Sequence, residues 1–216
     1  MQTMWLSERV VDNNLEISPE ALEWKDAYKL LVGSILPRPI AFVSTIDKNG
    51  IANAAPFSFF TAICADPMLI CFSPMRRGKD GAKKDTLINI ENTGQFVINI
   101  VSEKMAEQMN DCAIEFASSV DEIEEVNLTK EPSEKVKVPR IKESLVHLEC
   151  ELYQVLHFGD KPGAGSLVIG KVIQVHVNDE LYDNGRIDTT KLQPIGRMAG
   201  STFTNPLANT FEMIRK

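Results

Sequence analysis

Five cations stand close together in a chain that is otherwise acidic. Only Asp80 offsets them in the stretch formed by Arg76, Arg77, Lys79, Lys83 and Lys84. A helix is expected to begin directly afterwards, with Asp85 as its cap, Thr86 as its first residue and Gly94 as its stop. Because a helix N-terminus offers free N–H groups and a partial positive charge, this segment predicts a phosphate site. The alternative is a solvated basic loop ahead of an ordinary capped helix.

A second segment, residues 53–60, combines small and aromatic residues. Ala54 and Ala55 would let the main chain approach a flat ligand closely, and the Ser58 hydroxyl could hydrogen-bond to it. Phe57, Phe59 and Phe60 follow within four residues, more than one strand face needs. Either these rings contact a flat ligand, or they pack in the core of a sheet.

Other familiar catalytic patterns are absent from the sequence. Gly163-Ala164-Gly165 begins like a dinucleotide fingerprint, but Val168 stands where the third glycine belongs. There is no P-loop spacing, no G-x-S-x-G and no H-E-x-x-H. The four cysteines form no C-x-x-C and the three histidines are scattered, so neither a redox dithiol nor a metal site is expected.

The elements that must position these segments are mostly strands. β-branched, aromatic and alternating patterns predict strands over residues 40–46, 51–58, 68–72, 95–101, 148–152 and 166–177. Asp47-Lys48-Asn49-Gly50 predicts a tight turn between the first two. Residues 118–144 are acidic and then mixed, which predicts a surface excursion between strands. Many strands with few helices indicate a mainly β fold, a β-barrel with peripheral helices.

Length and charge limit the classes of function. A chain of 216 residues predicts one domain, and its net charge of −7 argues against a nucleic-acid or acidic-membrane binder. No apolar run approaches the ~18–20 residues of a membrane span. The opening residues Met1–Trp5 lack the basic region of a signal peptide. We therefore expect a cytoplasmic protein.

Four motifs in order resemble the flavin reductase-like family, the FMN-binding split-barrel group that includes flavoredoxin-type proteins. They are Pro37–Thr45, Asn53–Phe60, Asp66-Pro67-Met68 and Lys84-Asp85-Thr86 with Asn89. The resemblance runs from about residue 27 to residue 203, within a single domain over residues 1–216. It implies a six-stranded Greek-key split barrel, with FMN bound near a homodimer interface.

The resemblance also assigns cofactor-binding roles. The isoalloxazine would lie along Ala55, Ser58, Phe59 and Phe60, and Asn53 would also bind the cofactor. The phosphate end would be surrounded by Lys84, Asp85 and Thr86, with Arg77 and Lys79 as weaker candidates and Arg38 near the flavin. In the late segment 194–203, Ala199 and Phe203 depart from the family pattern, and Arg197 and Phe203 are candidates for a substrate-pocket wall.

On this interpretation the cofactor carries the chemistry, so no catalytic side chain is assigned. The leading hypothesis is an FMN-dependent oxidoreductase that transfers a hydride from NADH or NADPH to flavin and passes electrons to a small acceptor. FMN is expected in preference to FAD, because a phosphate loop is present without an adenosine-binding fingerprint. One alternative is a flavoredoxin-like electron carrier that serves a redox partner protein. Another is an FMN-binding module with a structural or storage role.

Overall fold

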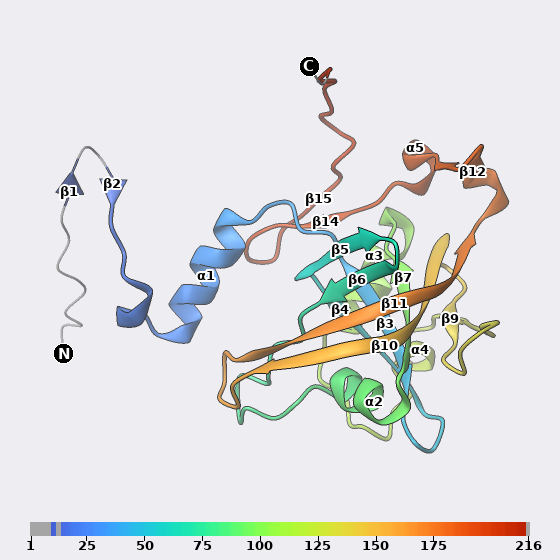
Figure 1. Cartoon of the computed structure of the whole chain (residues 1–216), viewed down its shortest axis with the longest axis horizontal. Coiled ribbons are helices and arrows are strands. Elements are labelled where there is room, and N and C mark those ends of the chain that lie inside the picture. Colours follow the sequence, from blue (N-terminus) through green and yellow to red (C-terminus); the bar gives the residue numbers. More distant parts are fainter. Residues whose placement is uncertain (1–9, 12–13, 215–216) are drawn as a thin grey trace.

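The structure is a computed structural model that describes residues 10–11 and 14–214, so the Met1–Trp5 segment lies outside it. Its centre is an antiparallel sheet with the strand order β4-β3-β7-β10-β11-β6-β5 (Figure 1). The strands are β3 (Ala41–Ile46), β4 (Ala52–Phe57), β5 (Phe60–Ala65), β6 (Met68–Phe72), β7 (Gln95–Ile100), β10 (Val146–Phe158) and β11 (Gly165–Val177).

This sheet confirms the mainly β fold and each of the expected strands. It contains seven strands where six were expected, because Phe60–Ala65 forms β5, which pairs with β6 at the edge of the sheet. The strand at 148–152 is also longer than predicted and runs through all of β10. The long pair β10 and β11 crosses the middle of the molecule (Figure 1).

Helices and short strands surround the sheet. The helices are α1 (Trp24–Ser34), α2 (Asp85–Thr93), α3 (Ala106–Asp111), α4 (Glu122–Glu125) and α5 (Thr189–Leu192), with 3₁₀ turns at Pro19–Ala21, Glu103–Met105 and Asp179–Leu181. Two-residue strands form the pairs β1 (Val10–Val11) with β2 (Asn14–Leu15), β8 (Lys130–Glu131) with β9 (Arg140–Ile141), β12 (Tyr182–Asp183) with β13 (Arg186–Ile187), and β14 (Gly196–Arg197) with β15 (Phe203–Thr204).

Strand β3 is buried on both faces, which explains the apolar run Ala41–Val43 with which it begins. Phe42 packs with Met105, Met109 and Ile123 in an outer core under α3 and α4. Ala41 and Val43 point the other way, into a second core inside the barrel. Side chains alternate along a strand, so β3 serves as the wall between the two cores.

Aromatic rings fill the barrel core. The ring centroids of Phe57 and Phe72 lie 5.2 Å apart, and those of Phe72 and Phe96 lie 5.7 Å apart. Gly170 is required beside them, because a Cβ there would lie 2.3 Å from Phe96 Cζ. Phe57 is therefore a core residue. For this ring, the alternative that segment 53–60 packs in the core of the sheet is confirmed.

The hairpin between β3 and β4 confirms the predicted turn. The Asp47 carboxylate accepts hydrogen bonds from the main-chain N–H groups of Asn49 and Ile51, both at 2.8 Å. Gly50 has a φ of 86°, a left-handed conformation that favours glycine. This turn fixes the register that places Asn53 opposite Thr45.

Residues 118–144 were expected to form a surface excursion, and this prediction is wrong. Ile123 and Ile141 are fully buried in the outer core, and Val138 is fully buried in a separate cluster with Val97. The charged residues of the segment conceal this role, because the buried apolar residues are spaced irregularly among them.

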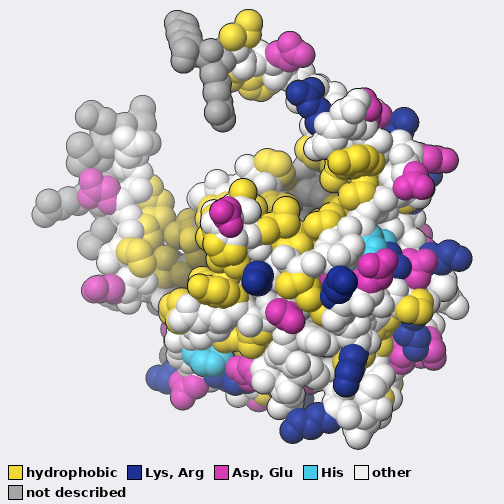
Figure 2. Space-filling view, turned by 45° about the vertical axis from the view of Figure 1, so that its right-hand side comes forward, with side chains coloured by type: hydrophobic (Ala, Val, Ile, Leu, Met, Phe, Trp, Pro, Cys, Tyr) yellow, Lys and Arg dark blue, Asp and Glu magenta, His cyan; other side chains and the backbone are white. Residues whose placement is uncertain are grey.

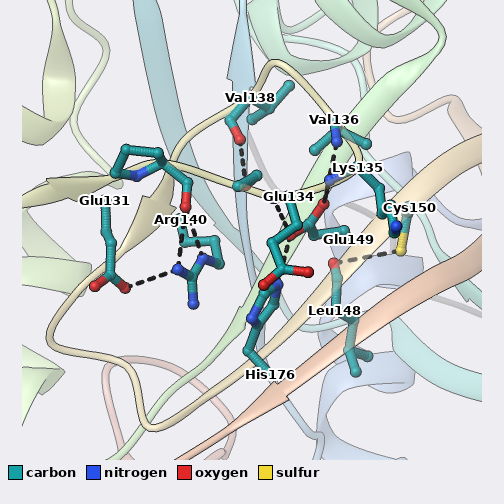
Figure 3. Close-up of polar contacts among 12 residues, drawn as sticks. Glu131, Glu134, Lys135, Val136, Val138, Arg140, Leu148, Glu149, Cys150 and His176 are labelled. Atoms are coloured by element: carbon teal, nitrogen blue, oxygen red, sulfur yellow. Dashed lines mark hydrogen bonds and ion pairs between the residues drawn. The ribbon is translucent and has the colours of Figure 1, made fainter.

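This segment also covers the polar face of β10 (Figure 3). Glu149 is fully buried, and its carboxylate accepts N–H hydrogen bonds from Glu134 at 2.8 Å, Lys135 at 2.6 Å and Val136 at 3.1 Å. His176 Nε2 lies 2.5 Å from the same carboxylate. Burial alone would raise the pKa of Glu149, but these donors lower it below its usual value.

Large apolar side chains remain exposed on α1 and on the β5–β6 edge. Leu31 is 50% exposed, Ile35 57% and Met68 48%. Figure 2 shows hydrophobic side chains gathered over one face of the molecule. No helix among the described residues has the length and apolar character needed to cross a membrane.

Candidate functional site

A cavity of about 340 Å³ lies where β4, the basic loop 75–84 and the start of α2 meet. Its volume falls in the range of small-molecule sites. Eight of the sequence-predicted residues line it together: Asn53, Ala55, Ser58, Phe59, Arg77, Lys84, Asp85 and Thr86. Residues up to 33 positions apart in the chain thus meet at one site, as the hydrogen bond between Thr86 and Asn53 illustrates.

One side of the cavity is mainly apolar. It is formed by the end of β4 and the segment 55–59, with Tyr28 of α1 beside them. The Tyr28 and Phe59 rings lie 6.3 Å apart at an interplanar angle of 42°. Ala55 presents only a methyl group to the cavity, so a planar ligand can approach the main chain there.

The opposite side is the anion end, which we define as Arg77, Lys84, Asp85 and Thr86. Asp85 was expected to cap α2, but it is the first helical residue, and Lys84 occupies the N-cap position. Among the described residues no side chain caps this nine-residue helix. Its first N–H groups are therefore available to an anion. The predicted stop at Gly94 is confirmed, with a φ of 70°.

Two carboxylates hold the cations of the anion end in place. Arg77 Nη2 donates to Asp85 Oδ2 at 3.0 Å. Glu115 Oε1 lies 3.4 Å from Arg77 Nη1 and 3.6 Å from Lys84 Nζ. Glu115 is half-exposed, so its carboxylate is a replaceable partner of both cations.

A buried polar network ties the helix start to the sheet. Thr86 Oγ1 donates to Asn53 Oδ1 at 2.8 Å, Thr45 Oγ1 donates to the same oxygen at 3.3 Å, and Asn89 Nδ2 donates to Thr45 Oγ1 at 3.1 Å. The Thr86 hydroxyl is thereby committed to Asn53. Its main-chain N–H is the group left for a ligand.

Glu122 of α4 forms part of the cavity floor. The side chain is buried, and one carboxylate oxygen accepts the Ala54 N–H at 2.8 Å. Burial raises the pKa of Glu122 to about 7, with Asp85 adding to the rise and hydrogen bonds from Ala54 and Asn53 opposing it. Glu122 also borders a neighbouring cavity of about 370 Å³.

Five predicted residues lie outside the cavity lining. Arg38 is buried and donates to the main-chain oxygens of Val32, Ile35 and Met198 and to Ser58 Oγ at 3.2 Å. It therefore supports the cavity wall from behind. The other four are Phe60 on β5, Lys79 on the exposed loop, and Arg197 and Phe203 on the β14–β15 pair.

Arg197 and Phe203 contact each other, with the guanidinium carbon 4.4 Å from the ring centroid. In this cation–π contact, each of the two side chains has a partner within the same chain. Their role as a substrate-pocket wall stays a prediction.

The cavity also includes residues that sequence reasoning missed. Tyr28 lies on a helix that showed no link to the motifs, residues 112–116 follow α3, and Glu122 lies in the segment expected at the surface. A signal existed only for Glu122, since a carboxyl beside the apolar Ile123 and Val126 could have suggested a helix with one buried side.

The flavin reductase like domain matches residues 32–191, which is most of the chain. The chain belongs to the flavin reductase-like family. The family resemblance found in the four motifs is thereby confirmed, and it places the chain among flavin-related oxidoreductases.

Solved structures agree with this family. Nitrilotriacetate monooxygenase component B from Bacillus cereus is 39% identical, with a TM-score of 0.88 over 94% of this chain and 100% of that one. The 2-nitrobenzoate 2-nitroreductase NbaA of Pseudomonas fluorescens is 33% identical, with a TM-score of 0.82 over 93% and 96% of the two chains.

The fold itself has a wider distribution. A flavin reductase candidate with a split barrel domain from Shewanella frigidimarina is 21% identical, with a TM-score of 0.78 over 94% of this chain and 100% of that one. The sheet of this flavin reductase-like chain is therefore a split barrel, as the motifs implied.

Proposed function

We propose that the protein is an FMN-dependent oxidoreductase that accepts a hydride from NADH or NADPH. The observation that carries the proposal is the cavity, which joins a mainly apolar wall to a helix start that has two cations and no side-chain cap. A flavin mononucleotide needs both features, since its ring is planar and its phosphate is anionic. The bound flavin would supply the redox chemistry.

The residues divide this task between them. The isoalloxazine fits along Ala55, Ser58 and Phe59, where the main chain is accessible. The phosphate fits at the anion end, where Lys84 and Arg77 supply charge and the first turn of α2 supplies N–H groups. The sequence has a phosphate loop without an adenosine-binding fingerprint, so FMN is favoured over FAD.

The visible spectrum of the flavin-loaded protein tests the reaction. Addition of NADH or NADPH without oxygen should bleach the flavin absorbance, and free flavin or another small acceptor should restore it. A bound flavin that neither nucleotide reduces would contradict the proposal. A flavin reduced only by a protein donor would instead support the electron-carrier alternative, and a flavin inert to both would support a structural or storage role.

We further propose that two copies form a homodimer around the cofactor. The apolar side chains exposed on α1 lie next to Tyr28, which lines the cavity, so a second copy seated there would cover both. Sedimentation equilibrium of the flavin-loaded protein should give twice the chain mass. A monomer with full flavin occupancy would contradict this arrangement.

Two related expectations complete the proposal. We propose a single domain over residues 1–216, to be checked by limited proteolysis, which should leave one resistant core. We also keep the cytoplasmic location as a prediction, to be checked by cell fractionation.

A further inference from the structure

Glu122 is the one carboxylic acid lining the main cavity that is more than nine-tenths buried. This statement covers the cavity-lining residues that the structure describes. One of its oxygens is held by the Ala54 N–H, at 2.8 Å. The acid thus sits on the cavity floor with a single main-chain donor.

The residues around Glu122 place it beside the anion end of the cavity. Asn53 precedes Ala54 on β4, and its side-chain oxygen accepts a hydrogen bond from the Thr86 hydroxyl in the first turn of α2. Lys84 and Asp85 act on the Glu122 carboxyl electrostatically from the same helix start. A phosphate placed on that helix start would therefore lie close to Glu122.

The charges that face Glu122 come from several elements. On α2 they are Lys84 and Asp85, and Asp85 is paired with Arg77. Cys112 at the end of α3 has a pKa raised to about 12 by burial, so it stays neutral near pH 7. Farther along the cavity rim are Glu115 and Tyr28, with Asp47 and Lys48 on the neighbouring cavity.

The acids on its own helix are directed elsewhere. Asp121 and Glu124 both pair with Lys130, each at 2.6 Å. Their charge is balanced outside the cavity. The state of Glu122 is thus set mainly by its burial and by what occupies the anion end.

Resting on the proposed function, we propose that Glu122 couples the binding of phosphorylated flavin to the uptake of a proton. As a neutral acid it can donate a hydrogen bond toward an anion. As a buried carboxylate, it repels a phosphate dianion. The protonated form therefore favours FMN over riboflavin, which lacks the phosphate.

The test compares FMN and riboflavin in the wild type and in Glu122→Gln. Dissociation constants are measured by flavin fluorescence quenching from about pH 7 to about pH 9, where the flavin phosphate is already a dianion. In the wild type the ratio of the FMN constant to the riboflavin constant should rise with pH, by up to about tenfold per pH unit. In Glu122→Gln the ratio should stay constant.

Glu124→Gln is the matched control, because Glu124 lies on the same helix but is exposed. It should behave as the wild type. A second measurement needs no variant: calorimetry in two buffers of different ionisation enthalpy should show proton uptake when FMN binds near neutral pH.

The outcomes are separable. A wild-type ratio that does not change with pH, or one that changes equally in Glu122→Gln, overturns the role of Glu122 while leaving FMN binding intact. Failure of the wild type to bind FMN at any pH overturns the proposed function itself.

Discussion

Two buried glutamates lie in two regions of the molecule and meet opposite environments. Glu149, under the segment 134–136, has three N–H donors and His176 around it, and its pKa is lowered. Glu122, in the cavity lining, has only the Ala54 N–H and the Asn53 side-chain amide as donors, and burial raises its pKa to about 7. Burial disfavours the charge of both, so the number of donors decides the difference.

The comparison separates a structural carboxylate from one poised to change state. Glu149 is satisfied as an anion and holds the covering segment on β10. Glu122 lacks the donors that would fix its charge, and it lies where a ligand can supply or remove an interaction. Incomplete satisfaction of a buried polar group marks the functional region here.

The largest expected effect is on folding. Glu149→Ala leaves three N–H groups, among them that of the buried Val136, without their acceptor, and it should lower the free energy of unfolding by about 3–5 kcal/mol. Denaturant titration measures this, with the exposed neighbour Glu151→Ala as a control that should change stability little. A loss below about 1 kcal/mol would mean that water replaces the carboxylate at little cost.

The second largest effect is on the pH dependence of the free energy of unfolding, which should distinguish Glu122 from Glu149. The native pKa of Glu122 lies above its unfolded value of 4.5, so its contribution makes the protein less stable as pH rises from 4.5 to about 7, by about 3 kcal/mol. Glu149 has a lowered native pKa, so its stabilisation is present above its unfolded pKa and disappears as pH falls through the native one.

Denaturant titrations across this pH range give the two contributions. Glu122→Gln should remove the decline between pH 4.5 and about 7 and leave the acid limb unchanged. If the variant and the wild type change in parallel over that interval, Glu122 does not titrate abnormally.

A smaller effect is expected at the anion end. Lys84→Ala should weaken FMN binding by about 1–3 kcal/mol, the scale of a hydrogen bond to a charged group, and should change riboflavin binding little. Lys79→Ala, in the same loop but outside the cavity lining, is the matched comparison and should bind both flavins nearly as the wild type does. Equal FMN affinity in Lys84→Ala at moderate salt would show that the loop is only a solvated surface.

The smallest effect concerns Glu115, which partners the same cations in the structure without ligand. Glu115→Gln should strengthen FMN binding by about 0.2–1 kcal/mol, because the ion pairs are half-exposed. Fluorescence titration with FMN, with riboflavin as the reference ligand, measures this change in binding free energy. Weaker FMN binding in the variant would mean that Glu115 supports the site.

Much of this arrangement could be predicted from sequence. The strands have strong local patterns, and the 53–60 and 84–86 motifs identified seven residues that the fold brings to one cavity together with Arg77 of the basic loop. The contacts of the long segment 118–144 could not be predicted, because its burial depends on irregular tertiary packing against β10 and α3. The burial of both Glu122 and Glu149 depends on this packing, and no local pattern indicates it.

The position of Asp85 shows a second limit. Its type suits a helix cap, but Arg77 engages the carboxylate, and the helix start is left open. Local propensity did not reveal this competition, since the partner comes from a loop eight residues earlier.

The most direct test of the central claim is the identity of the cofactor. Purified protein, saturated with a mixture of FMN and FAD and freed of excess ligand, is heated, and the released flavin is separated by chromatography. The account predicts FMN at about one per chain. Release of FAD alone, or of no flavin from protein that remains folded before heating, would contradict it.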